Sequence, residues 1–155
     1  MSDKLDVVGI GNAMVDAIIP SNQSEIEKHE INRDSMNLID ENLKNNLHES
    51  YSIREMAGGG SLGNSMFGIT SFGGNGSFIG KIKNDEIGVY LQKDMIREGL
   101  KFPLGFTSPD ISTGCCTIFV EEDGTRTMCT FLGAGTLIGP EAVSYTHLTL
   151  PTTVR

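Results

Sequence analysis

Apolar residues fall into strand-like runs in the first part of the chain. Residues 5–10 form an apolar run that contains Gly9, which predicts a buried strand, and residues 13–19 predict a second extended segment. Residues 37–39 also have an extended pattern. From 40 to 49, apolar residues recur at four-residue spacing, which predicts a short amphipathic helix.

Strand and helix patterns alternate in the middle of the chain. Apolar residues at near-helical spacing over 62–72 predict a buried helix that ends at Gly73-Gly74, and residues 77–82 predict a strand. Asp85 begins another helical pattern, which Gly99 stops. This alternation is typical of an α/β protein with a parallel sheet.

Two β-rich runs, 113–120 and 126–132, flank the sequence EEDGT. Asp-Gly at 123–124 is a strong hairpin signal. We therefore predict a doubly wound α/β core from which a few strands project as a small separate sheet.

Composition narrows the classes of function. The chain has 155 residues, of which 38% are hydrophobic, and this fits one domain with a sizeable core. A net charge of -8 argues against a nucleic-acid partner or an anionic membrane surface. We see neither an apolar run of about 20 residues nor a signal peptide, so we expect a cytoplasmic protein. The three cysteines lack metal-site spacing and are expected to be reduced core residues.

The first candidate site follows the first strand, where Gly9 and Gly11 precede Asp16. An ionised aspartate can accept hydrogen bonds from two hydroxyls of a polyol. One alternative is a dinucleotide fingerprint, but Met14 occupies its third glycine position and the following segment is a poor helix former. A second alternative is a turn or capping role for Asp16.

The second candidate site is the glycine cluster at 58–60, before the predicted helix. Glycines let backbone approach a ligand closely, and Asn64 in the first helical turn could present its amide to a hydroxyl. We expect Ser61 to be the N-cap of this helix. The cluster lacks the Gly-Lys-Ser/Thr of a Walker A loop, and a tight loop entering a helix is the structural alternative.

Further candidates lie near the predicted hairpin. Arg126 follows the turn and could steady a phosphoryl group, or it could be a solvated surface charge. Met36 and Cys116 could line an apolar substrate pocket, although core packing is the more common role of such residues.

Four sequence segments together resemble the PfkB/ribokinase family of carbohydrate kinases, and within it the adenosine-kinase-like sugar kinases. The segments are DVVGIGNAMVDAI, SMNLID, AGGGSLGNSMFGITSFGGNGSFIGKIKNDEIGVYL and TRTMCTFLGA. The resemblance covers about residues 5–141. It implies a ribokinase-like, Rossmann-type core with a small β-sheet lid, contributed here by about 13–39 and 113–132, within a kinase domain part at 1–142.

The resemblance also implies roles for individual residues. Asp16 matches the residue that holds sugar or ribose hydroxyls, and Asn12 lies in the same turn. Gly59, Gly60 and Asn64 match the acceptor-contacting diglycine and asparagine. Arg126 matches a lid arginine that approaches the transferred phosphate. The implied partner is a small sugar or nucleoside, and lids of this family often pair between subunits, which implies a homodimer of the full-length enzyme.

The resemblance implies transfer of the ATP γ-phosphate to a hydroxymethyl group, with Mg²⁺. That reaction uses a late Gly-Ala-Gly-Asp motif whose aspartate is the general base. Gly133-Ala134-Gly135 is followed here by Thr136, and it stands too early to be that motif. We therefore predict an inactive, truncated acceptor-binding half to which ATP and Mg²⁺ do not bind tightly.

The sequence VSYTHLTLPT, within 143–155, is the conceptual translation of a transposase adapter used in sequencing libraries. We interpret 143–155 as an adapter-derived tail that resequencing of the locus would test. Two further interpretations of the whole chain stay open. One is a non-catalytic sugar- or nucleoside-binding module, and the other, less favoured, is a dinucleotide-dependent oxidoreductase.

Overall fold

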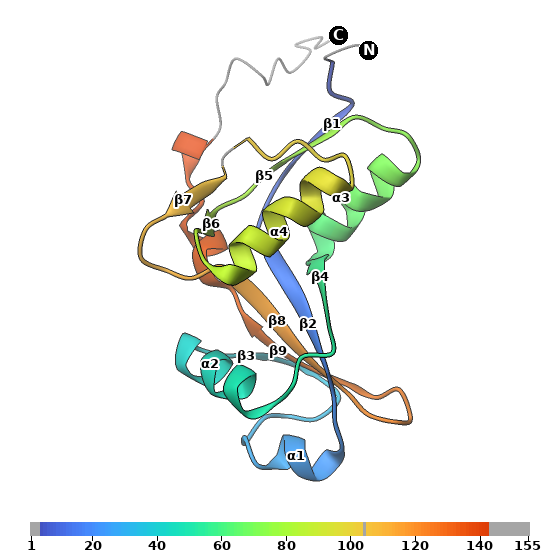
Figure 1. The fold of residues 1–155 in the computed structure, drawn as a ribbon, viewed down its shortest axis with the longest axis vertical. Coiled ribbons are helices and arrows are strands. Elements are labelled where there is room, and N and C mark those ends of the chain that lie inside the picture. Colours follow the sequence, from blue (N-terminus) through green and yellow to red (C-terminus); the bar gives the residue numbers. More distant parts are fainter. Residues whose placement is uncertain (1–3, 104, 143–155) are drawn as a thin grey trace, which may run out of the picture.

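The structure, a computed structural model, describes residues 4–103 and 105–142 (Figure 1). Its elements are, in chain order, β1 (Val7–Ile10), β2 (Met14–Pro20), α1 (Gln23–Glu27), β3 (Met36–Leu38), α2 (Glu41–Ser50), β4 (Glu55–Gly59), α3 (Ser61–Ser71), β5 (Gly76–Ile79), β6 (Ile82–Lys83), α4 (Glu86–Arg97), β7 (Phe106–Ser108), β8 (Gly114–Val120), β9 (Arg126–Phe131) and the 3₁₀ turns η1 (Gly133–Leu137) and η2 (Pro140–Ala142). The predicted tail, 143–155, lies outside the described residues.

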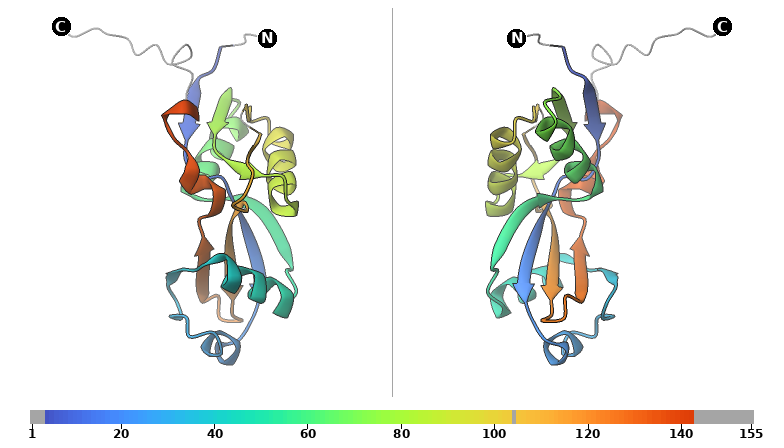
Figure 2. Two further views of the ribbon diagram at one scale, coloured as in Figure 1. Left: turned by 90° about the vertical axis from the view of Figure 1, so that its left-hand side faces the viewer. Right: turned by 90° about the vertical axis from the view of Figure 1, so that its right-hand side faces the viewer.

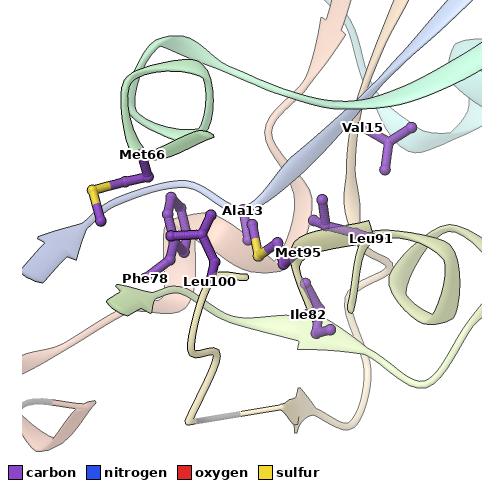
Figure 3. Packing of buried hydrophobic residues seen from close by; sticks show 8 residues of the cluster. All are labelled: Ala13, Val15, Met66, Phe78, Ile82, Leu91, Met95 and Leu100. Atoms are coloured by element: carbon purple, nitrogen blue, oxygen red, sulfur yellow. The ribbon is translucent and has the colours of Figure 1, made fainter. Parts of the chain in front are cut away.

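One end of the molecule is an α/β core. Strands β1 and β5 pair in parallel, and α3 and α4 pack beside them (Figure 1). Figure 3 shows the buried cluster that joins these elements, in which Phe78 of β5 lies beside Leu100, with Met66 of α3 on one side and Met95 and Leu91 of α4 on the other. Burial of such side chains contributes about 2 kcal/mol each, so this cluster is the main source of the core's stability.

The other end is a five-stranded mixed sheet with the order β3-β9-β8-β2-β4 (Figures 1 and 2). Its central strand is β8, and β2 lies between β8, with which it pairs in parallel, and the edge strand β4, with which it pairs antiparallel. Strand β4, which is not part of the predicted lid ranges, forms one edge of this sheet. Because β2 leaves the core at Ala13 and then crosses the sheet, it joins the two ends of the molecule.

A second buried cluster covers one face of this sheet. Ile26 of α1 and Leu47 of α2 pack against Ile19, Phe119 and Cys129 of the central strands. These three strand residues have odd numbers, and side chains alternate between the faces of a strand. The even-numbered side chains of β2, β8 and β9 therefore lie on the opposite face.

Most predicted elements are confirmed, with three corrections. Gly60, not Ser61, is the N-cap of α3. Gly58 and Gly59 lie in strand β4 instead of a loop. The predicted strand at 77–82 is two strands, β5 and β6. The three cysteines are free and buried, as predicted.

Asp85 joins the start of α4 to strand β8. Its side chain caps the helix by accepting a hydrogen bond from Gly88 N at 2.8 Å. It also accepts hydrogen bonds from the backbone N of Thr113 at 2.9 Å and from its hydroxyl at 2.8 Å. Thr113 is fully buried, so Asp85 satisfies donors that water cannot reach.

We expect His48 to make stability depend on pH. Its Nε2 lies 2.9 Å from Thr117 Oγ1. Burial, with the nearby charge of Lys44, lowers the pKa of His48 below its ordinary value of 6.5. Its contribution to stability is therefore complete above 6.5 and is lost as the pH falls through the lowered pKa.

The measurement is the urea midpoint at about pH 7.5 and about pH 5.5, for the wild type and for His48→Gln. The wild type should lose more stability on acidification than the variant, because the neutral amide does not titrate. Equal losses in the two proteins would contradict this assignment.

Among the described residues, no helix combines the length and the apolar character that crossing a membrane requires.

Candidate functional site

Asp16 lies on the even-numbered face of β2. Its neighbours Val15 and Ala17 are fully buried on the other face, so the alternation of the strand turns Asp16 away from the core. The strand register places Ala57 beside it on β4 and Cys116 beside it on β8. Cys116 is followed across the sheet by Thr130 of β9. Along this row of the sheet, the residues next to the Asp16 carboxylate have small side chains.

The electrostatic state of Asp16 is unusual for a surface carboxylate. Burial raises its pKa above the ordinary value of 3.8, and no counter-charge or hydrogen bond from the described part of the chain offsets this effect. A half-buried carboxylate loses part of its hydration, and here no donor from the described residues replaces the lost water. Hydroxyl groups of a ligand would supply the missing donors.

The glycine cluster lies against this carboxylate. A Cβ atom at Gly59 would overlap the Asp16 carboxyl group, whereas one at Gly58 would lie 2.8 Å from Asp94 Oδ2 on the other face of β4. Gly60 has φ +78°, a conformation that favours glycine. Each of the three glycines is therefore required for a different reason. Close neighbouring atoms exclude a side chain at Gly58 and Gly59, and the backbone conformation favours glycine at position 60.

Asn12 and Asn64 lie near the same glycines. The backbone oxygen of Asn12 would be 3.8 Å from a Cβ at Gly60, and Gly135 of η1 packs against the Asn12 side chain. Asn64 lies in the first turn of α3, where its backbone N donates to Gly60 O at 2.9 Å. The fold thus brings Gly59 to Asp16, whereas Asn12 and Gly60 lie together beside Met14, with Asn64 one helical turn beyond Gly60.

Cys116 and Met36 lie on the same sheet face but in different settings. Cys116 is 5% exposed and accepts a hydrogen bond from Thr130 Oγ1 at 3.3 Å, and burial raises the pKa of its thiol. Met36 is 55% exposed at the edge strand β3, where it pairs with Met128. Cys116 therefore borders Asp16 directly, whereas Met36 lies across the sheet from it.

Arg126 is exposed at the hairpin end of β9, where it pairs with Val120. Its even number places it on the face of Asp16. It is four positions along β9 from Thr130, which is about 13 Å at 3.3 Å per residue. In this conformation Arg126 lies at the far end of the sheet, away from the immediate surroundings of Asp16.

The Gly133-Ala134-Gly135 segment forms the buried 3₁₀ turn η1. Thr136 Oγ1 donates to Gly133 O at 2.8 Å, so this hydroxyl closes the turn. Among the described residues, no group of three or more His, Cys, Asp or Glu is placed to hold a metal ion.

Sequence reasoning missed Thr130 and Asp94. Thr130 could have been found from the period of two along β9, which places it on the face of Arg126. Asp94 could have been found because it is an acid three residues after Leu91, on the apolar side of α4. It is only 6% exposed.

The raised pKa of Asp16 predicts an effect of Asp16→Asn on the stability of the ligand-free chain. For an acid whose pKa is higher in the folded state, the stabilising contribution is present below the ordinary value of 3.8 and is lost as the pH rises through the folded pKa. As the pH rises, the free energy of unfolding of Asp16→Asn should therefore increase relative to that of the wild type. Urea denaturation of both proteins between about pH 3.5 and about pH 7 measures it, and a pH-independent difference would contradict it.

Comparison with known proteins supplies the context of this site. The family model described as pfkB family carbohydrate kinase matches residues 5–148. A probable sugar kinase from Rhizobium etli CFN 42 is 33% identical with a TM-score of 0.81. An adenosine kinase from Sinorhizobium meliloti is 36% identical with a TM-score of 0.82. An adenosine kinase from Anopheles gambiae, solved with P1,P4-di(adenosine-5) tetraphosphate, is 24% identical with a TM-score of 0.78.

These alignments cover most of this chain but less than half of each relative. The Rhizobium and Sinorhizobium proteins match over 92% of this chain, and over 43% and 44% of their own chains. The Anopheles protein matches over 90% of this chain and 43% of its own. No curated protein sequence is significantly similar to the chain.

Proposed function

This chain belongs to the pfkB family of carbohydrate kinases and has the ribokinase-like α/β fold, and we propose that it is the acceptor-binding half of such a kinase. The proposed acceptor is a sugar or a nucleoside with a free hydroxymethyl group. The proposed lid is the five-stranded sheet, and the acceptor would lie on its even-numbered face, against Asp16.

The observation that carries this proposal is the carboxylate of Asp16, to which no described residue donates a hydrogen bond. It is half-buried, its pKa is raised by burial, and the backbone of Gly59 packs against it without a side chain between them. Two vicinal hydroxyls of a sugar ring match the two carboxylate oxygens, and the diglycine leaves room for the ring. In support, two similar structures carry the names of a sugar kinase and an adenosine kinase.

The surrounding residues suit a ligand with a polar and an apolar part. We propose that Asn12 and Asn64 hold hydroxyls beside Asp16, and that Cys116 and Met36 border the apolar part. A cavity of about 260 Å³ lies at the outer end of this row. Its lining residues include Leu38, Thr130, Leu132, Gly133 and Thr136. We propose that Arg126 reaches a phosphoryl group only when the sheet closes over the acceptor.

We further propose that this chain alone does not transfer phosphate. In the full-length enzyme, ATP with Mg²⁺ would supply the phosphoryl group, and a general base would deprotonate the acceptor hydroxyl. Thr136 follows Gly133-Ala134-Gly135 and is not a base at neutral pH. Pairing of two lids in a homodimer remains a proposal for the full-length enzyme.

Isothermal titration with adenosine and with ribose tests acceptor binding. We expect saturable binding of at least one of them to the wild type, and a loss of at least about 30-fold in affinity for Asp16→Asn, since the amide replaces a charged acceptor of two hydrogen bonds. Absence of binding by the wild type, or unchanged binding by the variant, would overturn the assignment of the site.

A coupled assay with ATP, Mg²⁺ and the same acceptors tests inactivity. We expect no turnover above the rate without protein. Turnover that disappears in Asp16→Asn would show that this chain contains a complete catalytic centre.

A further inference from the structure

Two side chains of α4 contact the outer edge of β4, beside the glycines of the proposed acceptor site. Asp94 Oδ2 accepts a hydrogen bond from Gly58 N at 2.9 Å. The hydroxyl of Tyr90 donates to the carbonyl oxygen of Met56. Tyr90 and Asp94 are four residues apart, so both extend from the same side of the helix.

These contacts occupy the free edge of the sheet. Strand β4 is the last strand in the order β3-β9-β8-β2-β4, so nothing in this sheet pairs with its outer side. Residues two apart in a strand direct their backbone groups to the same side. Met56 and Gly58 therefore present an acceptor and a donor outward, and Tyr90 and Asp94 satisfy them as a neighbouring strand would.

Burying the carboxylate of Asp94 costs more free energy than covering the edge of β4 alone would require. It is 6% exposed, it lies on the apolar side of α4, and its counter-ion is Arg97, whose side chain is 68% exposed. Burying a carboxylate costs several kcal/mol unless it is hydrogen-bonded and paired. Asp94 meets both conditions through Gly58 N and Arg97, so its burial depends on the Gly58 amide staying in place.

Gly58 cannot move freely for a second reason. A Cβ at Gly58 would lie 2.7 Å from the Phe67 ring of α3 as well as 2.8 Å from Asp94 Oδ2. The next residue, Gly59, packs against the Asp16 carboxyl group on the opposite face. A small displacement of Gly58 away from α4 would therefore change the gap between Gly59 and Asp16.

We propose that Asp94, together with Tyr90, is a positioning residue of the acceptor site, because it fixes the edge of β4 and thereby holds Gly59 against Asp16. This inference rests on the proposed function, since it assigns a purpose to the gap between Gly59 and Asp16. Asp94 acts through the β4 backbone and does not contact the acceptor.

The test compares Asp94→Ala, Asp94→Asn and Tyr90→Phe with the control Lys93→Ala, an exposed position on the same helix. Adenosine and ribose are the probes, with affinity measured by titration. We expect Asp94→Ala to weaken binding about tenfold, and Asp94→Asn to restore most of it, because its amide oxygen still accepts from Gly58 N. Tyr90→Phe should weaken binding a few-fold, and Lys93→Ala should not change it.

The NMR amide resonances of Gly58, Gly59 and Gly60 in the ligand-free protein supply a second measurement. A change in stability alone would not shift them. All three should shift in Asp94→Ala, and only that of Gly58 in Asp94→Asn. Folded Asp94→Ala and Tyr90→Phe that bind as tightly as the wild type would overturn the proposal. If Asp94→Ala does not fold, unchanged affinity of Tyr90→Phe overturns it.

The two proposals fail in distinguishable ways. If the wild type binds neither probe, the proposed function fails, and the resonances of Gly59 and Gly60 still decide whether Asp94 positions the strand. If the wild type binds but the Gly59 resonance is unchanged in Asp94→Ala, the positioning inference alone fails.

Discussion

Gly59→Ala is expected to abolish measurable binding of the acceptor, with a loss of at least about 100-fold in affinity. The added Cβ would overlap the carboxyl group of Asp16, so either the side chain or strand β4 must move. Overpacking of this kind also costs about 1–3 kcal/mol of stability. Titration with adenosine and ribose, together with urea denaturation, separates the two effects.

Gly68→Ala is the matched control. Gly68 lies inside α3, and a Cβ there would have no neighbour within 4 Å. The same change should therefore leave affinity unchanged and raise stability by about 0.5–1 kcal/mol, because alanine favours a helix. If Gly59→Ala binds as tightly as the wild type, the close approach of β4 to Asp16 is not required for the function we propose.

Asp85→Ala is expected to lower the free energy of unfolding by about 3 kcal/mol, which is a large part of the total for a small domain. The change removes the cap of α4 and leaves the buried N–H of Thr113 without its acceptor, and the Thr113 hydroxyl keeps only its longer contact of 3.4 Å with Lys83 O. Chemical denaturation followed by circular dichroism measures this loss.

Asp40→Ala provides the comparison for Asp85. Asp40 caps α2 by accepting from Leu43 N at 2.8 Å, and it joins no buried threonine. Its loss should cost about 1 kcal/mol, the usual value for an N-cap. Equal losses for the two variants would mean that the contacts with Thr113 contribute nothing to stability.

Local signals predicted the helices and the hairpin well. Asp40 and Asp85 precede apolar repeats, and in the structure both are N-caps. Asp123-Gly124 lies between β8 and β9, as the hairpin signal indicated. Capping and turn chemistry depend on neighbours in sequence, so these features follow from short segments.

The sequence supplied candidate residues for the proposed site but not their arrangement. Asp16 and Gly59 were both candidates, yet their contact depends on the antiparallel pairing of β2 with β4, which no local pattern specifies. The glycine cluster indicated either close approach to a ligand or a tight loop, and not the strand in which Gly58 and Gly59 lie, because glycine is rare in strands. Tertiary contacts with Asp16, Phe67 and Asp94 override that preference.

The parallel pairing of β2 with β8 has a consequence for how fast the chain folds. It joins residue 14 to residue 114, so the strand that carries Asp16 gains its inner neighbour only after most of the chain has been synthesised. Closing so long a loop has an entropic cost that must be met before the contact stabilises anything. We expect slow, late formation of the acceptor face and earlier folding of the β4–α3 segment, where contacts are local. The pairing that places Cys116 beside Asp16 is thus also the step that we expect to set the rate of assembly.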